Sequence, residues 1–171
     1  KVIPSYYSRY SDRDVGSNWI IYRLTDIMLL KAEALTQQLQ EGSTQEVIDY
    51  NTPILDQAFW LVNAVNKRSV CETTLVDTLV RSDYGTKSQM EKLVYQERQR
   101  ELMFEGKRWF DLVRISQREG NTQTLTAAAL LKASMGGSVI ANKLTKMDAI
   151  YWPYNYDELK VNLKLKQNPA F

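Results

Sequence analysis

Four charged residues recur at helical spacing in the stretch ERQRELMFEGKRWFDLVR, which runs from Glu97 to Arg114. If the stretch is one helix, these charges fall on one line among Leu, Phe, Trp and Ile side chains. The residues on this line are Glu97, Glu101, Arg108 and Asp111. Carboxylates enclosed by apolar side chains can serve as a general acid and base, or as ligands of a di-metal centre. They can also belong to a structural ion network that fixes how helices dock.

The composition favours the structural network. The chain has no His, which is the commonest general base and metal ligand and which a Glu-x-x-His di-iron bundle requires. A glycosidase needs two carboxylates across an open cleft, whereas each carboxylate here has a basic neighbour within one or two helical turns. We therefore expect no enzyme activity, no metal and no cofactor. Hydrolysis by Glu97, Glu101 and Asp111 remains the catalytic alternative.

The other totals describe an ordinary globular chain. It has 171 residues and a net charge of +2 from 22 basic and 20 acidic residues, so there is no basic excess for binding nucleic acid. The lone cysteine, Cys71, cannot form an internal disulfide and is expected to be a small buried hydrophobe. No run approaches the ~18 apolar residues of a membrane helix. The chain opens at Lys1 without Met, so we expect a piece of a longer protein whose N-terminal portion is missing.

The elements that must position the charged residues are predicted to be helical. Apolar spacing predicts a helix over about 20–40, and a second that begins near Ser43 or at Pro53, giving a helical hairpin over about 20–68. A connection over 69–88 leads to the charged helix, over about 87–118, in which Gly106 is expected to allow close approach of another backbone. Residues 119–171 are predicted to be a loop region with short helical turns. The fold class is therefore all-α, mostly helical with long irregular loops, in a single domain over 1–171.

The charged stretch resembles the signature helix of the SusD/RagB family, which carries an E-R-x-x-E-L, F-E-G-x-R, D-L-x-R pattern. Two further blocks agree in the same order: RLTDIMLLKAEAL, with Asp26 in place of the usual Glu, and the tail PYNYDELKVNLKLKQNPAF. In the tail, Ala170 and Phe171 replace the family's Gly and Tyr. The resemblance covers about 20–171, the C-terminal part of longer family members. It implies a tetratricopeptide-like hairpin followed by a SusD-type C-terminal region, with a structural ion network made of Glu97, Arg98, Glu101, Glu105, Arg108 and Asp111.

The resemblance implies a function without catalysis. Members of this family are surface nutrient-binding lipoproteins of Bacteroidota outer membranes. They cover a TonB-dependent transporter of the SusC kind and pass oligosaccharides, or in some members peptides, to it. The membrane would be reached only through an N-terminal lipid anchor that this chain does not contain. The tetratricopeptide-like helices would mainly face the transporter.

Capture of a sugar suggests where ligand contacts should be sought. Sugar rings stack their C–H faces on exposed aromatic side chains, while polar side chains bond the hydroxyls. One candidate is SYYSRYSDRD, and the other is YWPYNY; the alternative in both is that the aromatic rings simply pack on the domain. Trp60 and Trp109 lie on apolar helix faces and are expected in the core. The candidate ligand contacts are Tyr6, Tyr7, Arg9, Tyr10, Tyr151 and Trp152.

The runner-up function is a helical-repeat scaffold that binds another protein and no nutrient. A packed helix that lacks a neighbour exposes apolar surface. We therefore expect the helix over about 20–40 to carry an exposed apolar stripe.

Overall fold

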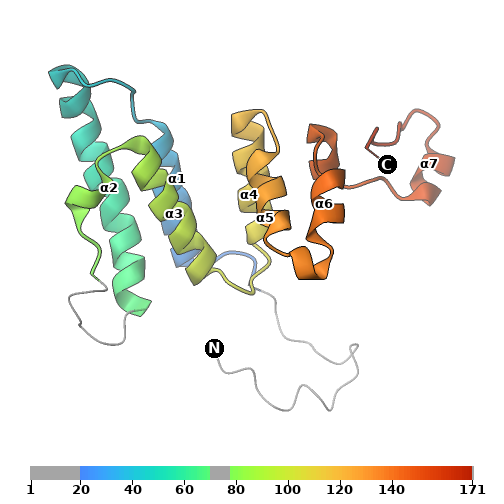
Figure 1. Cartoon of the computed structure of the whole chain (residues 1–171), viewed down its shortest axis with the longest axis horizontal. Coiled ribbons are helices and arrows are strands. Elements are labelled where there is room, and N and C mark those ends of the chain that lie inside the picture. Colours follow the sequence, from blue (N-terminus) through green and yellow to red (C-terminus); the bar gives the residue numbers. More distant parts are fainter. Residues whose placement is uncertain (1–19, 70–77, 171) are drawn as a thin grey trace, which may run out of the picture. The chain divides into compact units, whose positions relative to one another are not determined.

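The computed structural model describes residues 20–69 and 78–170. Within these ranges the chain forms seven α-helices and no strand, which confirms the all-α prediction (Figure 1). The internal contacts divide the chain into two compact units, Lys1–Glu97 and Arg98–Phe171. The assignment of both units to one domain stays a prediction. Across the described residues, no helix has both the length and the apolar character needed to cross a bilayer.

The first unit begins with the expected helical hairpin, built from α1 (Leu24–Gln37) and α2 (Gln45–Ser69). α2 begins close to Ser43, so Pro53 lies inside the helix and not in its first turn. The Asn51 side chain closes the turn between the helices. Its Oδ1 accepts the Gln40 N–H at 2.9 Å, and its Nδ2 donates to the Gln40 carbonyl oxygen at 2.8 Å.

A third helix, α3 (Lys87–Glu101), packs on this hairpin. Apolar residues recur at helical spacing in all three helices, so one core joins them. Polar contacts add to it: the Tyr95 hydroxyl donates to Glu33 Oε1 at 2.9 Å, and Gln37 Nε2 donates to Glu91 Oε1 at 2.9 Å. The buried residues of this core are Leu29, Ala32, Leu39, Leu55, Ala58, Phe59, Leu61, Val62, Val65, Met90, Leu93 and Val94.

The predicted single helix over 87–118 is wrong, because the chain breaks between α3 and α4 (Arg108–Glu119). Phe104 has a φ of 68° and Gly106 a φ of 71°, both in the left-handed region. Neither conformation can continue an α-helix, so the chain changes direction between α3 and α4. A Cβ added at Gly106 would meet nothing within 4 Å, so this glycine serves the turn and not the expected close approach. The four charges that the sequence placed on one line are therefore divided between two helices.

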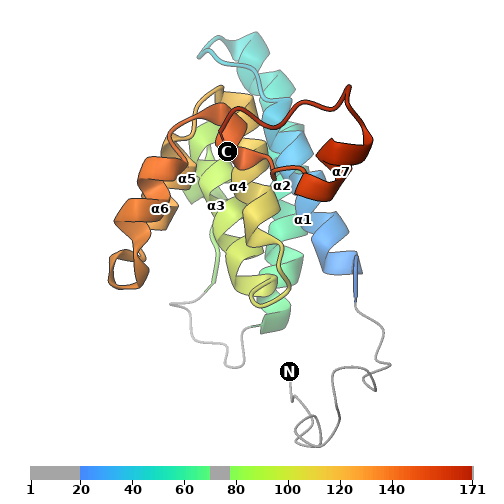
Figure 2. The same ribbon diagram turned by 90° about the vertical axis from the view of Figure 1, so that its right-hand side faces the viewer.

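The second unit contains α4, α5 (Gln123–Leu130), α6 (Gly137–Lys143) and α7 (Tyr156–Val161). The three short helices after α4 lie in the region 119–171, for which the sequence predicted loops with short helical turns. α5 and α6 lie side by side (Figure 2). A Cβ at Gly137 would come within 2.2 Å of the Ala129 carbonyl oxygen, so only glycine fits there. The small core of the unit is formed by the buried residues Leu112, Leu125 and Ile150.

Two expectations about exposed side chains have opposite outcomes. Trp60 was expected in the core and is instead 63% exposed on α2, so that prediction is wrong. α1 carries the expected apolar stripe, since Leu24 is 75% exposed and Ile27, one turn later, is 50% exposed. Trp109 is partly buried against the core of the second unit.

Candidate functional site

A buried ion pair joins the end of α3 to α4 in the second unit. The Arg98 guanidinium donates to Asp111 Oδ1 from Nε at 3.0 Å and from Nη2 at 2.9 Å. Arg114, one turn further along α4, donates to the same oxygen at 2.7 Å. Arg98 and Asp111 are 2% and 1% exposed, so this is a desolvated pair in which each charge depends on the other.

The other residues expected in the ion network have different surroundings. Glu97 lies in the first unit, is buried, and accepts a hydrogen bond from Asn66 Nδ2 of α2 at 3.1 Å. Glu101 and Glu105 are partly buried, and Arg108 is exposed. The structure therefore brings Arg98 and Asp111 together and places Glu97 against another helix. That all six residues act as one network stays a prediction.

The burial and hydrogen bonds of these carboxylates determine whether they can reach a substrate. Hydrolysis requires a carboxyl oxygen that can reach a substrate or a water molecule. Glu97 and Asp111 are each 1% exposed and are hydrogen-bonded to protein partners. In the part of the chain that the structure describes, no three His, Cys, Asp or Glu side chains are grouped as metal ligands would be.

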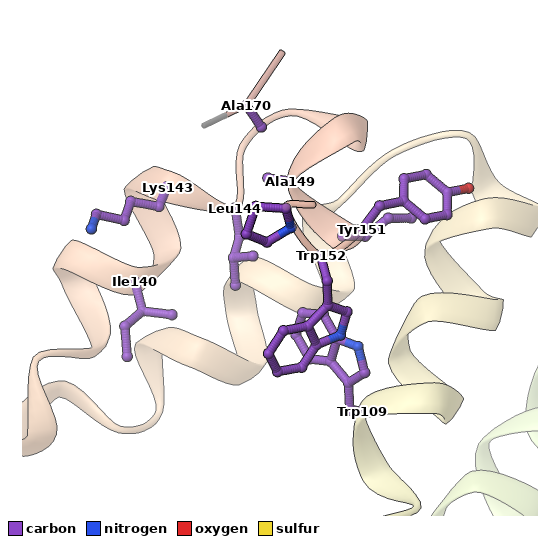
Figure 3. A pocket seen from close by; sticks show the side chains of 10 residues that line it. Trp109, Ile140, Lys143, Leu144, Ala149, Tyr151, Trp152 and Ala170 are labelled. Atoms are coloured by element: carbon purple, nitrogen blue, oxygen red, sulfur yellow. The ribbon is translucent and has the colours of Figure 1, made fainter. Parts of the chain in front are cut away.

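A different feature of the second unit has the shape of a ligand site. A pocket of about 650 Å³ lies between α4, α6 and the segment that follows α6 (Figure 3). It contains two of the aromatic residues that the sequence singled out, Tyr151 and Trp152. The indole of Trp109, on α4, also lines it, although the sequence suggested a core residue. The remaining lining residues are Ile140, Lys143, Leu144, Ala149, Ile150, Pro153 and Ala170.

Packing leaves much of the Tyr151 and Trp152 side chains exposed. Trp152 is 81% exposed and Tyr151 is 51% exposed, although both follow directly on the buried Ile150. Exposed indole and phenol rings beside a hollow provide flat apolar surfaces with a polar edge, which suits an amphipathic ligand. Both rings are thus available beside the pocket, and that they contact a ligand stays a prediction.

The C-terminal tail holds the segment that carries these two rings. Asn168 Nδ2 donates to the carbonyl oxygens of Asp148 and Tyr151, at 2.8 and 3.0 Å. Gln167 makes two hydrogen bonds with the backbone of Tyr154. Its Oε1 accepts the Tyr154 N–H at 2.9 Å, and its Nε2 donates to the Tyr154 carbonyl oxygen at 3.1 Å. Two amide side chains thus replace the regular backbone pairing that this irregular segment lacks.

The sequence found part of this site and missed the rest. Tyr151 and Trp152 stood out because aromatic residues cluster in YWPYNY. Ile140 and Leu144 gave no signal of a site, since an i, i+4 apolar pair is what any packed helix shows. The other candidates, Tyr6, Tyr7, Arg9 and Tyr10, lie outside the described residues, as does Cys71.

Comparison with known proteins places the chain beside one curated relative. SusD-like protein P38 from Formosa agariphila is 33% identical over 158 residues, which is 91% of this chain and 25% of that protein. The chain thus spans about a quarter of the length of this curated relative. No solved structure matches the chain significantly. The family model described as the SusD family matches residues 2–171, and the chain belongs to that family.

Proposed function

We propose that this protein is a non-enzymatic receptor that binds oligosaccharide nutrients at the cell surface. Membership of the SusD family supports a carbohydrate-binding role in nutrient uptake. The observation that carries the proposal to particular residues is the pocket between α4 and α6, with the exposed indole of Trp152 and the indole of Trp109 in its lining.

The pocket would bind sugar by stacking. A pyranose ring has an apolar face made of C–H groups, and an indole offers a flat apolar surface of similar size. Stacking on Trp152 removes both surfaces from water while the ring hydroxyls at the open side stay hydrated. The amide contacts from Gln167 and Asn168 fix the backbone beneath the ring, which lowers the entropy lost on binding.

The remaining parts of the proposal follow from the family. The protein would act with a TonB-dependent transporter of the SusC kind, at the outer membrane of Bacteroidota, and would be held there by a lipid anchor in an N-terminal portion. Oligosaccharides are the proposed ligands, and peptides are the alternative within the same role. The burial of Glu97 and Asp111 supports binding without hydrolysis.

Calorimetric titration of the full-length protein with a panel of oligosaccharides tests the proposed site. Trp152→Ala should weaken binding of any saccharide ligand at least about fivefold, because loss of one aromatic stacking contact removes about 1 kcal/mol or more. Trp60→Ala is the matched control, since Trp60 is also exposed but lies on α2, in the first unit. Equal affinities of the two variants would place the saccharide site elsewhere, and no saccharide binding at all would contradict the receptor role.

A second candidate function is a scaffold that binds another protein and no nutrient. The exposed apolar stripe of α1, with Leu24 and Ile27, favours it, because such stripes mark surfaces that another chain covers. Leu24→Glu should then abolish co-purification with the transporter, and the unchanged protein should bind no saccharide in the calorimetric titration. If the protein binds the transporter but no saccharide, the scaffold is the better description.

A further inference from the structure

The pocket between α4 and α6 is unusually poor in polar side chains for a sugar site. Among the described residues that line the pocket, Lys143 and Tyr151 are the only ones besides the two tryptophans that bring polar side-chain atoms to it. Sites for highly hydroxylated sugars normally need a set of convergent polar groups that replace the bonds the hydroxyls made to water. The lining here is aliphatic and aromatic instead.

Both of these polar groups are also directed away from the hollow. The Tyr151 phenol points away from α6, and its oxygen accepts a hydrogen bond from Gln117 Nε2 at 3.0 Å (Figure 3). The ammonium of Lys143 points away from the two indoles, so the part of Lys143 that lines the pocket is its methylene stem. A hydroxyl group that enters the hollow would therefore lose its bonds to water and find few partners, which is costly.

The aliphatic wall is provided by α6. Ile140 lies in α6 and Leu144 caps its C-terminus; the two are four residues apart and so lie on the same side. Across the hollow are the indoles of Trp109 and Trp152. The pocket thus has a flat aromatic side, which suits a ring face, and an aliphatic side, which suits a methyl group.

We propose that the pocket selects saccharides that carry methyl groups, such as 6-deoxy or acetylated sugars, over their fully hydroxylated counterparts. This inference rests on the proposed function, since it names the class of saccharide that the same site takes. The ring stacks on the indoles and its methyl group contacts Ile140 and Leu144. A hydroxymethyl group in the same place leaves a hydroxyl without a partner.

Matched ligand pairs test the selection directly. Calorimetry with the full-length protein would compare oligosaccharides of a 6-deoxyhexose with those of the parent hexose, and chitotetraose with cellotetraose. The expected preference for the methyl-bearing member is about 10- to 100-fold in Kd, the range in which an apolar pocket distinguishes small groups. Ile140→Asn should reduce this preference about tenfold. Val139→Asn is the matched control, because Val139 is a neighbouring exposed residue of α6 that does not line the pocket.

The outcomes separate this inference from the proposed function. If saccharides bind, Trp152→Ala weakens them, and both members of each pair bind equally, the selection is wrong and the receptor role stands. If the hydroxylated members bind more tightly, the selection is likewise wrong. If no saccharide of either kind binds, the proposed function fails and the selection fails with it. Loss of the preference in Ile140→Asn but not in Val139→Asn supports the inference.

Discussion

At the scale of single residues, the strongest constraint is the buried pair of Arg98 and Asp111. Their attraction offsets the cost of removing two charges from water, and removal of one partner leaves the other uncompensated. Arg114 also forms an ion pair with Asp111, so one carboxylate balances two guanidinium groups. We therefore infer that the Asp111 carboxylate stabilises the fold.

Asp111→Asn should lower the free energy of unfolding by about 3–5 kcal/mol in urea titrations followed by circular dichroism. Asp157→Asn is the control, because the Lys160–Asp157 pair at 3.3 Å is exposed and should contribute less than about 1 kcal/mol. The double replacement Arg98→Met with Asp111→Leu should recover much of the loss, since no charge is left unpaired. A stable Asp111→Asn variant would mean that this pair does not hold α4 to the end of α3.

At the scale of elements, the turn between α3 and α4 decides which charges can meet. Residue types alone predicted that Glu97, Arg98 and Asp111 would be buried and paired, because a charge among apolar side chains needs a partner. Their partners depend on the break, because two left-handed residues redirect the chain after Glu101. A single glycine within a helical pattern did not reveal the break, since Phe104 is a residue that seldom adopts this conformation.

Phe104 and Gly106 should respond in opposite directions to substitution. Phe104→Gly should raise the free energy of unfolding by about 1 kcal/mol, because Phe104 is 91% exposed and its left-handed conformation is strained. Gly106→Ala should lower it by about 1–2 kcal/mol, since it adds a Cβ in the same region of φ. Urea titration of both variants measures the difference, and changes of the same sign would argue against this turn.

The tail is the second element whose role depends on tertiary structure. The sequence marked Gln167 and Asn168 as a family motif, but only the fold shows that their amides hold the segment of Tyr151 and Trp152. The hydrogen bonds of these amides to Asp148, Tyr151 and Tyr154 span 13 to 20 residues along the chain, so no local pattern could reveal them.

Asn168→Ala should weaken saccharide binding about tenfold without touching the ligand, because two hydrogen bonds to the backbone of the pocket wall are lost. Calorimetry would measure the affinity of this variant and of Asn162→Ala, a control in which the side chain accepts the nearby Lys164 N–H at 3.1 Å. Unchanged affinity of the Asn168 variant would show that the wall keeps its shape without the tail.

At the scale of the whole molecule, hydrophobic spacing predicted the hairpin of α1 and α2 and, from the predicted helices, the all-α class. Spacing did not predict the short helices, since α5 and α6 have only eight and seven residues. Their contact also depends on Gly137, a residue type that is unfavourable in helices. It also failed for Trp60, because an apolar residue on an amphipathic helix is assigned to the core by default although many stay exposed. The pocket could not be predicted, since its walls come from residues up to 61 positions apart, from Trp109 to Ala170.

The most direct test of the account uses the indole N–H signals of the four tryptophans in a ¹⁵N-labelled sample. Each signal can be assigned by a Trp→Phe replacement, and a saccharide that binds the full-length protein is then titrated in. We expect the signals of Trp109 and Trp152 to shift with the occupancy of the site, while the signal of Trp60 stays in place. Saturating ligand that leaves both pocket signals unmoved would contradict this expectation.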